Sequence, residues 1–264
     1  HLGVTPVLEG ERIVLETGAV AWLERPPGRG PFPGAVFFHG NDYHASMQSS
    51  AVVVRRALLD AGYLVLSVDQ PGYGQSPGPA LDADVAEWNP LPTAVAAVES
   101  LQSRSDVSKV FILGHSMGSL QVLRLLSTQS GVAGAVLFGA ALAEVPIEFD
   151  EARYERFHNK RRIQARIPRD RYLEIENLLY DIMPIVESLD SDHPPVYFVR
   201  FGHEWSDVRS GRDALYEAIP GRKIVWDFVD STHYFSSKRF GDLIAGDTRV
   251  VQELASRLRE LVGE

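Results

Sequence analysis

One short turn constrains the fold of this chain more than any other feature. The residues Gly114, His115, Ser116, Met117 and Gly118 stand between an apolar run and a helix-like pattern. Their spacing, G-x-S-x-G, is that of a nucleophile elbow, in which a sharp strand-to-helix turn exposes a serine hydroxyl. Glycines two residues before and after the serine leave room where a Cβ would collide with a neighbouring element. The motif predicts a nucleophile at Ser116, and the alternative is an ordinary turn that contains a serine.

Composition and charge exclude several classes of protein. The chain has 264 residues, a formal net charge of −9 and an apolar fraction of 45%, which suits a globular protein with a sizeable core and argues against a general nucleic-acid binder. The absence of cysteine excludes disulfides, thiol catalysis and cysteine-bound metals. No apolar run approaches the ~20 residues of a membrane-spanning helix. We therefore expect no nucleic-acid partner and no stable membrane span, and the sequence predicts no oligomeric state.

The compartment is only weakly indicated by the sequence. No signal peptide is visible, which favours a cytoplasmic protein. The sequence starts at His1 rather than at methionine. A secreted or anchored form with a removed N-terminal segment is therefore the alternative.

Along the chain, buried strands alternate with helices. An N-terminal hairpin over residues 12–24 and a surface loop over 25–34 precede this pattern. The predicted strands are 35–38, 63–68, 110–113, 133–139, 195–201 and 223–228, and the predicted helices are 49–61, 92–102, 117–127, 213–219 and 248–262. Continuously apolar strands that alternate with helices predict an α/β fold, with a mostly parallel sheet covered by helices on both faces.

Three motifs in order carry a resemblance to a known family. They are His39-Gly40, then Asp69-x-x-Gly72-x-Gly74-x-Ser76, then Gly114-x-Ser116-x-Gly118. This order resembles the α/β-hydrolase superfamily, in its esterase, lipase and acyl-hydrolase branch, over residues 12–139 and from 194 to the C-terminus. The resemblance implies the α/β-hydrolase fold, with a core formed by residues 1–141 and 193–264. Asp69 precedes the nucleophile, and we interpret it as a residue that braces its loop.

Between the two parts of this core, residues 142–192 interrupt the pattern. Much of this segment is predicted to be helical, over 151–167 and over 169–189, with Pro184 as a kink or break. In the family that the chain resembles, an insertion here forms a helical cap, or lid, over the active site. Its many basic residues could attract anionic substrates, but a solvated helix face is the favoured interpretation. Its apolar residues could line an acyl pocket or anchor the cap.

The resemblance also implies a base and an acid that follow the serine in the order serine, acid, histidine. His233 follows the last predicted strand and precedes the final helix, which is where the family places its base. His115 lies inside the elbow, and we expect it to pack beside the serine rather than to take its proton. The family often has Gly-x-x-Asp after the preceding strand, but Trp205 occupies that spacing from Gly202.

Two residues are therefore the main candidates for the acid of the triad. Glu204 is the favoured choice because it lies at about the right distance from the start of the predicted strand, if that strand is one residue longer than usual, and a glutamate reaches far enough to hold the imidazole Nδ1–H. Asp207 is the alternative acid, and Glu144 comes third because some members of the fold place the acid after an earlier strand.

The backbone N–H groups of Asn41 and Met117 are the expected oxyanion hole. Asn41 follows His39-Gly40 at the end of an early strand, and Met117 follows the nucleophile. The alternative for Asn41 is a loop stabilised by polar side chains. His39, Asp42 and His44 match no zinc pattern, so we expect no metal site there.

These residues predict a serine hydrolase that cleaves carboxylic esters of small to medium acyl chains through an acyl-enzyme. The expected partner is a small-molecule ester, and the mechanism requires neither a metal nor an organic cofactor. A thioesterase, an amidase or a perhydrolase would use the same triad. A protein of this fold that binds a ligand or partner without catalysis is a further alternative.

Overall fold

The structure is a computed structural model that describes residues 10–42, 44–140, 142, 145–161, 166–235 and 248–263. The side chains of Ser49, Asp207 and Thr248 lie outside this description. In the described part of the chain, no helix combines the length and the apolar character that crossing a membrane requires.

A single eight-stranded sheet organises the fold. Its strands are β1 (Glu11–Val14), β2 (Val20–Glu24), β3 (Phe32–Phe38), β4 (Leu64–Val68), β5 (Val107–His115), β6 (Val132–Phe138), β7 (Val196–His203) and β8 (Lys223–Thr232). Their spatial order is β1-β2-β4-β3-β5-β6-β7-β8. The pairings of β1 with β2 and of β2 with β4 are antiparallel, and the others are parallel. The predicted hairpin and the mostly parallel sheet are both confirmed.

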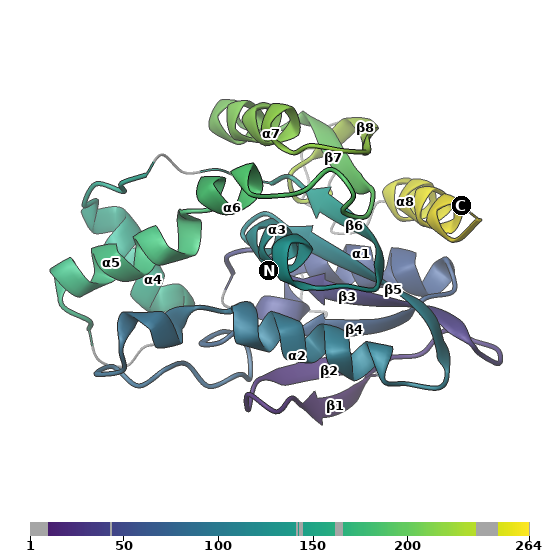
Figure 1. Ribbon diagram of the computed structural model, residues 1–264, viewed down its shortest axis with the longest axis horizontal. Helices are drawn as coiled ribbons and strands as arrows, with labels where there is room; N and C mark the ends of the chain where they lie inside the picture. The colour runs from purple at the N-terminus through teal and green to yellow at the C-terminus, as the bar shows by residue number, and fades with distance from the viewer. Residues whose placement is uncertain are drawn as a thin grey trace.

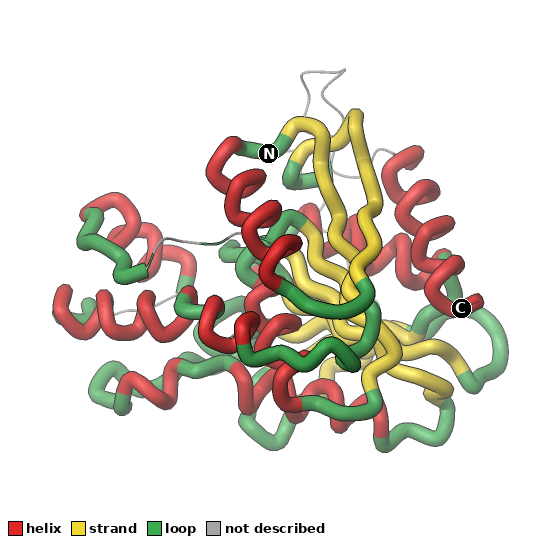
Figure 2. Tube along the Cα trace, turned by 45° about the horizontal axis from the view of Figure 1, so that its top comes forward, coloured by secondary structure: helices red, strands yellow, loops and turns green. Residues whose placement is uncertain are grey.

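Helices cover both faces of this sheet (Figures 1 and 2). The helices of the sheet layers are α1 (Ser49–Asp60), α2 (Leu91–Gln102), α3 (Gly118–Thr128), α7 (Ser206–Ala218) and α8 (Thr248–Gly263). Residues of α2, α3 and α7, such as Val98, Leu123 and Leu215, share one hydrophobic cluster. Leu58 of α1 and Leu254 of α8 belong to a second cluster on the other face. Full burial of each such side chain contributes about 1.5–3 kcal/mol, so both faces must be covered for the sheet to be stable.

Two boundaries differ from the sequence-based expectation. β3 begins at Phe32, inside the predicted loop, because Phe32 is buried and its N–H donates to the Asp106 carbonyl at 2.8 Å. Prolines and glycines around it hide this strand from a pattern search. α7 begins at Ser206 rather than at residue 213. The sequence pattern does not reveal its first turns, because they are polar and bury few residues, among them Val208.

The described residues between β6 and β7 form three helices, α4 (Glu151–Lys160), α5 (Arg169–Tyr180) and α6 (Met183–Glu187). Figure 1 shows α4 and α5 set apart from the sheet. They share a third hydrophobic cluster with Trp88, at the end of the short 3-10 helix η2 (Val85–Trp88). A second 3-10 helix, η1 (Ala45–Met47), precedes α1. Ile182 and Val186 instead join the main core beside α3.

The predicted break of the second helix occurs, but not at Pro184. α5 ends at Tyr180, and Pro184 lies in the first turn of α6. A proline is tolerated in the first turn because the N–H it lacks would have no partner within the helix. The sequence predicts either a kink or a break at Pro184, and the structure has a break just before it, between Tyr180 and Met183.

Candidate active site

Ser116 occupies the turn between β5 and α3, at the carboxyl end of the central strands. Its φ is +52°, a left-handed conformation that costs a non-glycine residue of the order of 1–3 kcal/mol. A Cβ on Gly114 would overlap the carbonyl oxygen of Gly118, and a Cβ on Gly118 would overlap the carbonyl oxygen of Phe38. The two glycines are therefore required where the turn meets its neighbours, as the motif predicts.

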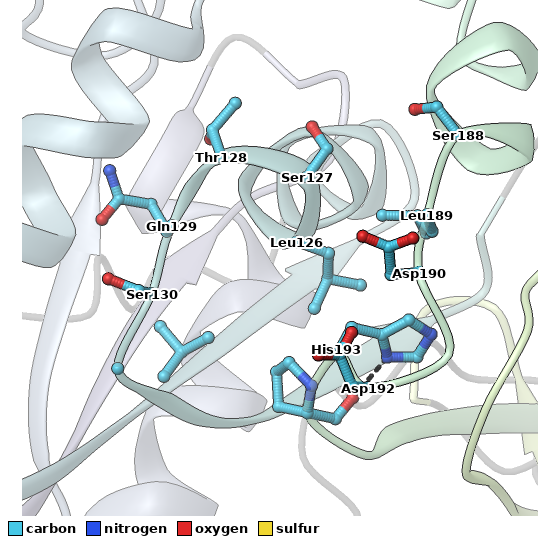
Figure 3. Close-up of a pocket in the computed structure, with 13 residues that line it drawn as sticks. Leu126, Ser127, Thr128, Gln129, Ser130, Ser188, Leu189, Asp190, Asp192 and His193 are labelled. Carbon is cyan, nitrogen blue, oxygen red and sulfur yellow. Dashed lines mark hydrogen bonds between the residues drawn. The ribbon is translucent and has the colours of Figure 1, made fainter.

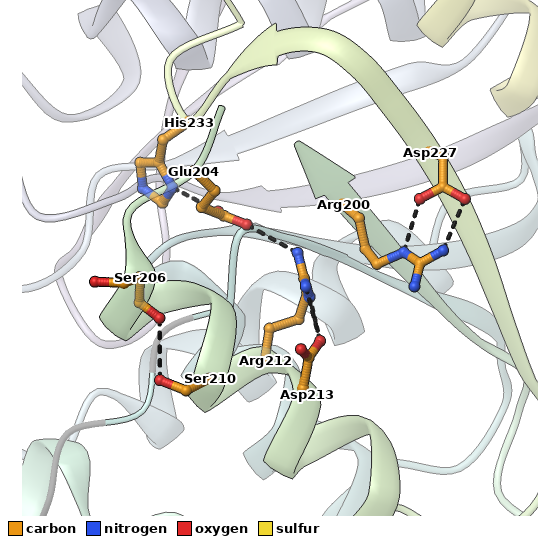
Figure 4. A network of polar contacts seen from close by, with 8 residues as sticks. All are labelled: Arg200, Glu204, Ser206, Ser210, Arg212, Asp213, Asp227 and His233. Carbon is orange, nitrogen blue, oxygen red and sulfur yellow. Dashed lines mark hydrogen bonds and ion pairs between the residues drawn. The ribbon is translucent and has the colours of Figure 1, made fainter. Parts of the chain in front are cut away.

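His233 and Glu204 lie together at the ends of adjacent strands. The Nδ1 atom of His233 is 3.0 Å from Oε1 of Glu204, and the two side chains are 5% and 0% exposed. Glu204 directly follows β7, and His233 directly follows β8 (Figure 4). Phe235 anchors the turn after His233, since its ring is buried against Phe138 and Phe201. With Nδ1 engaged, Nε2 is the ring nitrogen that can exchange a proton with another group.

Gly139 explains how this pair can approach the serine. The Ser116 N–H donates to the carbonyl oxygen of Phe138 at 2.8 Å, so the elbow is fixed to the end of β6. Gly139 follows, and a Cβ there would lie 2.7 Å from both Oε1 of Glu204 and Nδ1 of His233. Sequence reasoning did not identify this glycine, and its position at the end of a buried strand is the only signal that could have done so.

Arg212 is a second residue that the sequence did not single out. Its Nη1 atom lies 3.1 Å from Oε2 of Glu204, and its Nη2 atom lies 2.7 Å from Oδ1 of Asp213 (Figure 4). The Arg212 side chain is 7% exposed. Each oxygen of the buried Glu204 carboxylate therefore has its own partner, which offsets the cost of removing the charge from water.

The predicted oxyanion-hole donors belong to two segments that meet at the elbow, the loop after β3 and the turn after Ser116. A Cβ on Gly40 would be 3.2 Å from the Cβ of Ser116, so the loop after β3 packs against the elbow. In the described part of the chain, no atom accepts a hydrogen bond from the backbone N–H of Asn41 or of Met117. Met117 also adjoins the N-terminus of α3, where the helix dipole favours negative charge. Both N–H groups are therefore free to bind an oxyanion.

His39 fixes the direction of the Asn41 N–H. Its Nδ1 atom is 2.6 Å from the Gly40 carbonyl oxygen, while its Nε2 atom accepts from the Gln70 N–H at 3.1 Å. The same Gly40 oxygen also accepts from the Asp42 N–H at 2.9 Å. The Asn41 N–H belongs to the same trans peptide as this carbonyl and points opposite to it. The bonds to the Gly40 oxygen therefore also fix the direction of the Asn41 N–H. Burial lowers the pKa of His39, so the neutral form that this arrangement needs is favoured.

Asn41 is also held from the side of the predicted cap. The Nζ atom of Lys160, the last residue of α4, donates to the Asn41 carbonyl oxygen at 2.6 Å. The Tyr73 hydroxyl donates to Oδ1 of Asn41 at 2.8 Å. The Arg161 guanidinium lies 5.0 Å from the centre of the Tyr73 ring. The sequence showed Lys160 only as one member of a basic segment, and a contact across 119 positions leaves no local signal.

His115 lies beside His233, as expected. The two ring centres are 4.8 Å apart, and Nε2 of His115 is 2.8 Å from the His233 carbonyl oxygen. Burial, and then the neighbouring His233, lower the pKa of His115 to about 3. His115 is therefore neutral near pH 7 and supports the backbone of the His233 turn.

Asp69 braces its loop, which confirms the interpretation made from the sequence. One carboxylate oxygen accepts from the Ser46 N–H at 3.1 Å, and the other accepts from the Gln75 N–H at 2.9 Å. Asp42 makes a comparable local contact, since its Oδ1 atom lies 2.8 Å from the His44 backbone nitrogen. These carboxylates hold loops in place around the site.

Several basic side chains of α4 and α5 are paired with acids of the same region. Arg153 and Arg161 both contact the buried Glu176. Arg166 pairs with Glu155, and Arg169 with Glu151. These ion pairs favour the structural interpretation of the basic segment over an anion-attracting rim. The backbone of Asp207 lies in the first turn of α7, but its side chain, like the whole of Glu144, is outside the described part of the structure.

A cavity of about 560 Å³ lies elsewhere, at the far end of α3 (Figure 3). It is lined by residues around the C-terminus of α3 and by the segment before β7, including Gln129 and Asp190. Because a helix rises about 1.5 Å per residue, Leu126, the first residue of α3 that lines this cavity, lies roughly 12 Å along the helix from Gly118. It is therefore not part of the candidate active site.

Solved structures with the same fold include several esterases and hydrolases. 2,6-Dihydroxy-pseudo-oxynicotine hydrolase superposes with a TM-score of 0.68 at 17% identity, over 99% of this chain and 70% of that protein. Est1E from Butyrivibrio proteoclasticus, solved with ferulic acid, also has a TM-score of 0.68 at 17% identity, over 96% of this chain and all of Est1E. At these identities the similarity establishes the α/β-hydrolase fold.

Sequence comparison assigns the family. Esterase EstD of Thermotoga maritima is 29% identical over 122 residues, which are 44% of this chain and 29% of EstD. The match thus spans less than a third of that relative. The family described as serine aminopeptidase, S33, matches residues 34–175, more than half of the chain. The chain is therefore a member of the serine aminopeptidase S33 family of α/β hydrolases.

Proposed function

We propose that this protein hydrolyses carboxylic esters of small to medium acyl chains through an acyl-enzyme on Ser116. One observation carries the proposal: His233 is hydrogen-bonded to the buried Glu204 and packs against His115, the neighbour of a serine held in the left-handed conformation of a nucleophile elbow. A serine nucleophile needs a base within reach and an acid that orients the base. The family and the similarity to esterases support hydrolysis as the reaction class.

In the proposed mechanism, His233 takes the proton of Ser116 through Nε2 while Ser116 Oγ attacks the acyl carbonyl carbon. Glu204 keeps the Nδ1–H of His233 in place and stabilises the imidazolium that forms. The N–H groups of Asn41 and Met117 bind the oxyanion, and one such donor typically contributes about 3 kcal/mol to transition-state stabilisation. His233 then gives its proton to the leaving alcohol. A water activated by His233 releases the acid.

We also infer that residues 142–192 form the cap of this site. Three observations support this role: α4 and α5 stand apart from the sheet, they have their own hydrophobic cluster, and Lys160 contacts the loop of Asn41. A cap of this kind excludes water from the site and limits the size of the acyl group. Mostly aromatic and aliphatic side chains form the α4–α5 cluster, which fits an anchoring role for them.

Two assays test the proposal with the same variant. The wild-type protein is expected to hydrolyse p-nitrophenyl acetate or butyrate and to react covalently with a fluorophosphonate probe, and Ser116→Ala should lose both activities. Ser127→Ala, near the other end of α3, is the matched control and should keep both. A well-folded wild-type protein that the probe does not label would overturn the assignment.

A substrate panel separates the proposal from related reactions. Thioesters, amides and esters with equal acyl groups are compared by kcat/KM, and the ester should be hydrolysed faster than the amide. A higher kcat/KM for the amide would be compatible with the proposed triad but would contradict the assignment as an esterase. A chain-length series of p-nitrophenyl esters then defines the acyl limit.

A further inference from the structure

Two exposed aromatic side chains flank His233. Trp205 is 52% exposed and Tyr234 is 37% exposed, which places them among the few large apolar side chains at the surface of the described residues. Trp205 is the residue that replaces the expected aspartate of the family pattern. Large apolar side chains that gather at the surface next to a site are typical of ligand binding. We call Trp205 and Tyr234 together the aromatic corner.

The corner has a defined geometry around the imidazole. The ring centre of Trp205 lies 5.1 Å from that of His233, with 34° between the planes. The ring of Tyr234 lies 5.4 Å from His233 at 89°, and 5.7 Å from Trp205 at 77°. These distances are within the range in which aromatic rings attract one another. The imidazole of His233 thus has one tilted aromatic ring and one perpendicular aromatic ring beside it.

The fold does not explain why residue 205 is a tryptophan. It occupies the N-cap position of α7, and its side chain makes no capping hydrogen bond. Serine, threonine, aspartate or asparagine would stabilise the start of the helix better at this position. About half of the Trp205 side chain also stays in water rather than in the core. A role in binding explains both facts.

The position of the corner identifies the part of the substrate that it faces. This step rests on the proposed function. When Ser116 Oγ has formed its bond to the acyl carbon, the bond from that carbon to the alcohol oxygen breaks, and the proton on Nε2 of His233 moves to this oxygen. The alcohol oxygen must therefore come within hydrogen-bond distance, about 3 Å, of Nε2. Whatever is attached to that oxygen lies next to the rings that flank His233.

We propose that Trp205 and Tyr234 form the leaving-group subsite and select esters of aromatic alcohols. The alcohol ring stacks on Trp205 and meets Tyr234 edge-on, and it leaves as the free alcohol once His233 has protonated it. The acyl group lies on the other side of the scissile bond, toward the Asn41 loop, and makes no contact with the corner. The corner thus affects the choice of alcohol and not the choice of acid.

Three acetates test this inference because only their leaving groups differ. The alcohols of 2-naphthyl, phenyl and hexafluoroisopropyl acetate have similar acidity, but they present two rings, one ring and none. In a pH-stat assay, kcat/KM of the wild-type protein should fall in that order. Trp205→Ala should reduce the preference for naphthyl over hexafluoroisopropyl acetate by about fivefold, since aromatic contacts of this kind are worth such factors. Trp205→Phe should keep most of the preference.

The controls separate binding from support of His233. Leu81→Ala removes another exposed apolar side chain and should leave the preference unchanged. If Trp205→Ala slows all three acetates by the same factor, Trp205 only supports the imidazole and the subsite is refuted. A second pair, trifluoroethyl acetate and trifluoroethyl phenylacetate, places the ring on the acyl side. If Trp205→Ala changes the kcat/KM ratio of this second pair alone, the corner contacts the acyl group, and this result also refutes the subsite.

Failure of the subsite and failure of the proposed function are distinguishable. A folded wild-type protein that hydrolyses none of the acetates contradicts the esterase assignment and the leaving-group role with it. A wild-type protein that hydrolyses all three acetates without preference contradicts the subsite alone.

Discussion

Arg212 and His233 hold opposite oxygens of one buried carboxylate. Nη1 of Arg212 is 3.1 Å from Oε2 of Glu204, and Nδ1 of His233 is 3.0 Å from Oε1 (Figure 4). The Glu204 side chain is fully buried. A carboxylate in this position is stable as an ion only while its partners remain, because the interior does not solvate it. The guanidinium therefore stabilises the fold and fixes the orientation of the residue that holds the imidazole.

Replacing Arg212 by methionine should destabilise the protein and slow catalysis. The change leaves a buried carboxylate without its cation, for which about 3 kcal/mol of unfolding free energy is expected. We expect kcat for p-nitrophenyl acetate to fall at least about tenfold, because Glu204 is free to leave the imidazole. Urea unfolding and steady-state kinetics measure the two effects.

Arg200→Met is the matched control for this change. Arg200 forms a bidentate pair with Asp227 on neighbouring strands, but the two side chains are 43% and 51% exposed. An exposed pair of this kind contributes no more than about 1 kcal/mol, and its two hydrogen bonds do not involve Glu204. Equal losses of stability and activity in the two variants would contradict the role assigned to Arg212.

The choice between Glu204 and Asp207 can be tested by removing each charge. Glu204→Gln should lower kcat by about 10³ to 10⁴-fold, since the amide holds the imidazole in the wrong tautomer. Asp207→Asn should retain most of the activity, because the carboxylate bonded to His233 is that of Glu204. Circular dichroism of both variants shows whether the fold persists. A large loss confined to Asp207→Asn would exchange the roles of the two residues.

The parts of the fold that the sequence predicts are those with a local cause. The order of strands and helices follows from apolar periodicity, and the turn at Ser116 follows from glycines within two residues of it. His233 and Glu204 could be selected because the family that the chain resembles places its base and its acid after the last two predicted strands. Phe32 was missed because the prolines around it disguise a central strand.

The contacts that surround these residues have no local cause. Lys160 meets Asn41 across 119 positions, and Tyr73 meets it across 32. Arg212 reaches Glu204 only because α7 begins seven residues earlier than its polar sequence suggests. Such contacts depend on how finished elements pack, and a single sequence carries no pattern for them.

Lys160 is expected to influence the rate rather than the affinity. Its ammonium donates to the Asn41 carbonyl and so restrains the loop whose N–H is proposed to bind the oxyanion. Burial lowers the pKa of Lys160, and the nearby Asp42 opposes this effect. Lys160→Met should lower kcat by about tenfold with little change in KM, because a misplaced oxyanion donor weakens binding of the transition state more than of the substrate.

The control for Lys160 is another lysine that donates to a backbone carbonyl. Nζ of Lys109 lies 3.0 Å from the carbonyl oxygen of Val262, near the end of α8. Lys109→Met removes the same charge and the same type of hydrogen bond away from the Asn41 loop. Its kcat should equal that of the wild-type protein, and a similar loss in both variants would show that the effect is not specific to the loop.

His115 should make the protein less stable in acid. Its pKa is lowered to about 3 in the folded protein, whereas an unfolded histidine titrates near 6.5. Below that value the unfolded chain binds a proton that the folded protein does not, so unfolding becomes more favourable as the pH falls. From pH 7.5 to 5.0 this one group should remove about 2 kcal/mol of unfolding free energy. In His115→Gln, whose amide can still donate to the His233 carbonyl, the fall between these pH values should be smaller by that amount. Urea unfolding of both proteins at the two pH values measures the difference, and equal falls would show that His115 does not couple folding to pH.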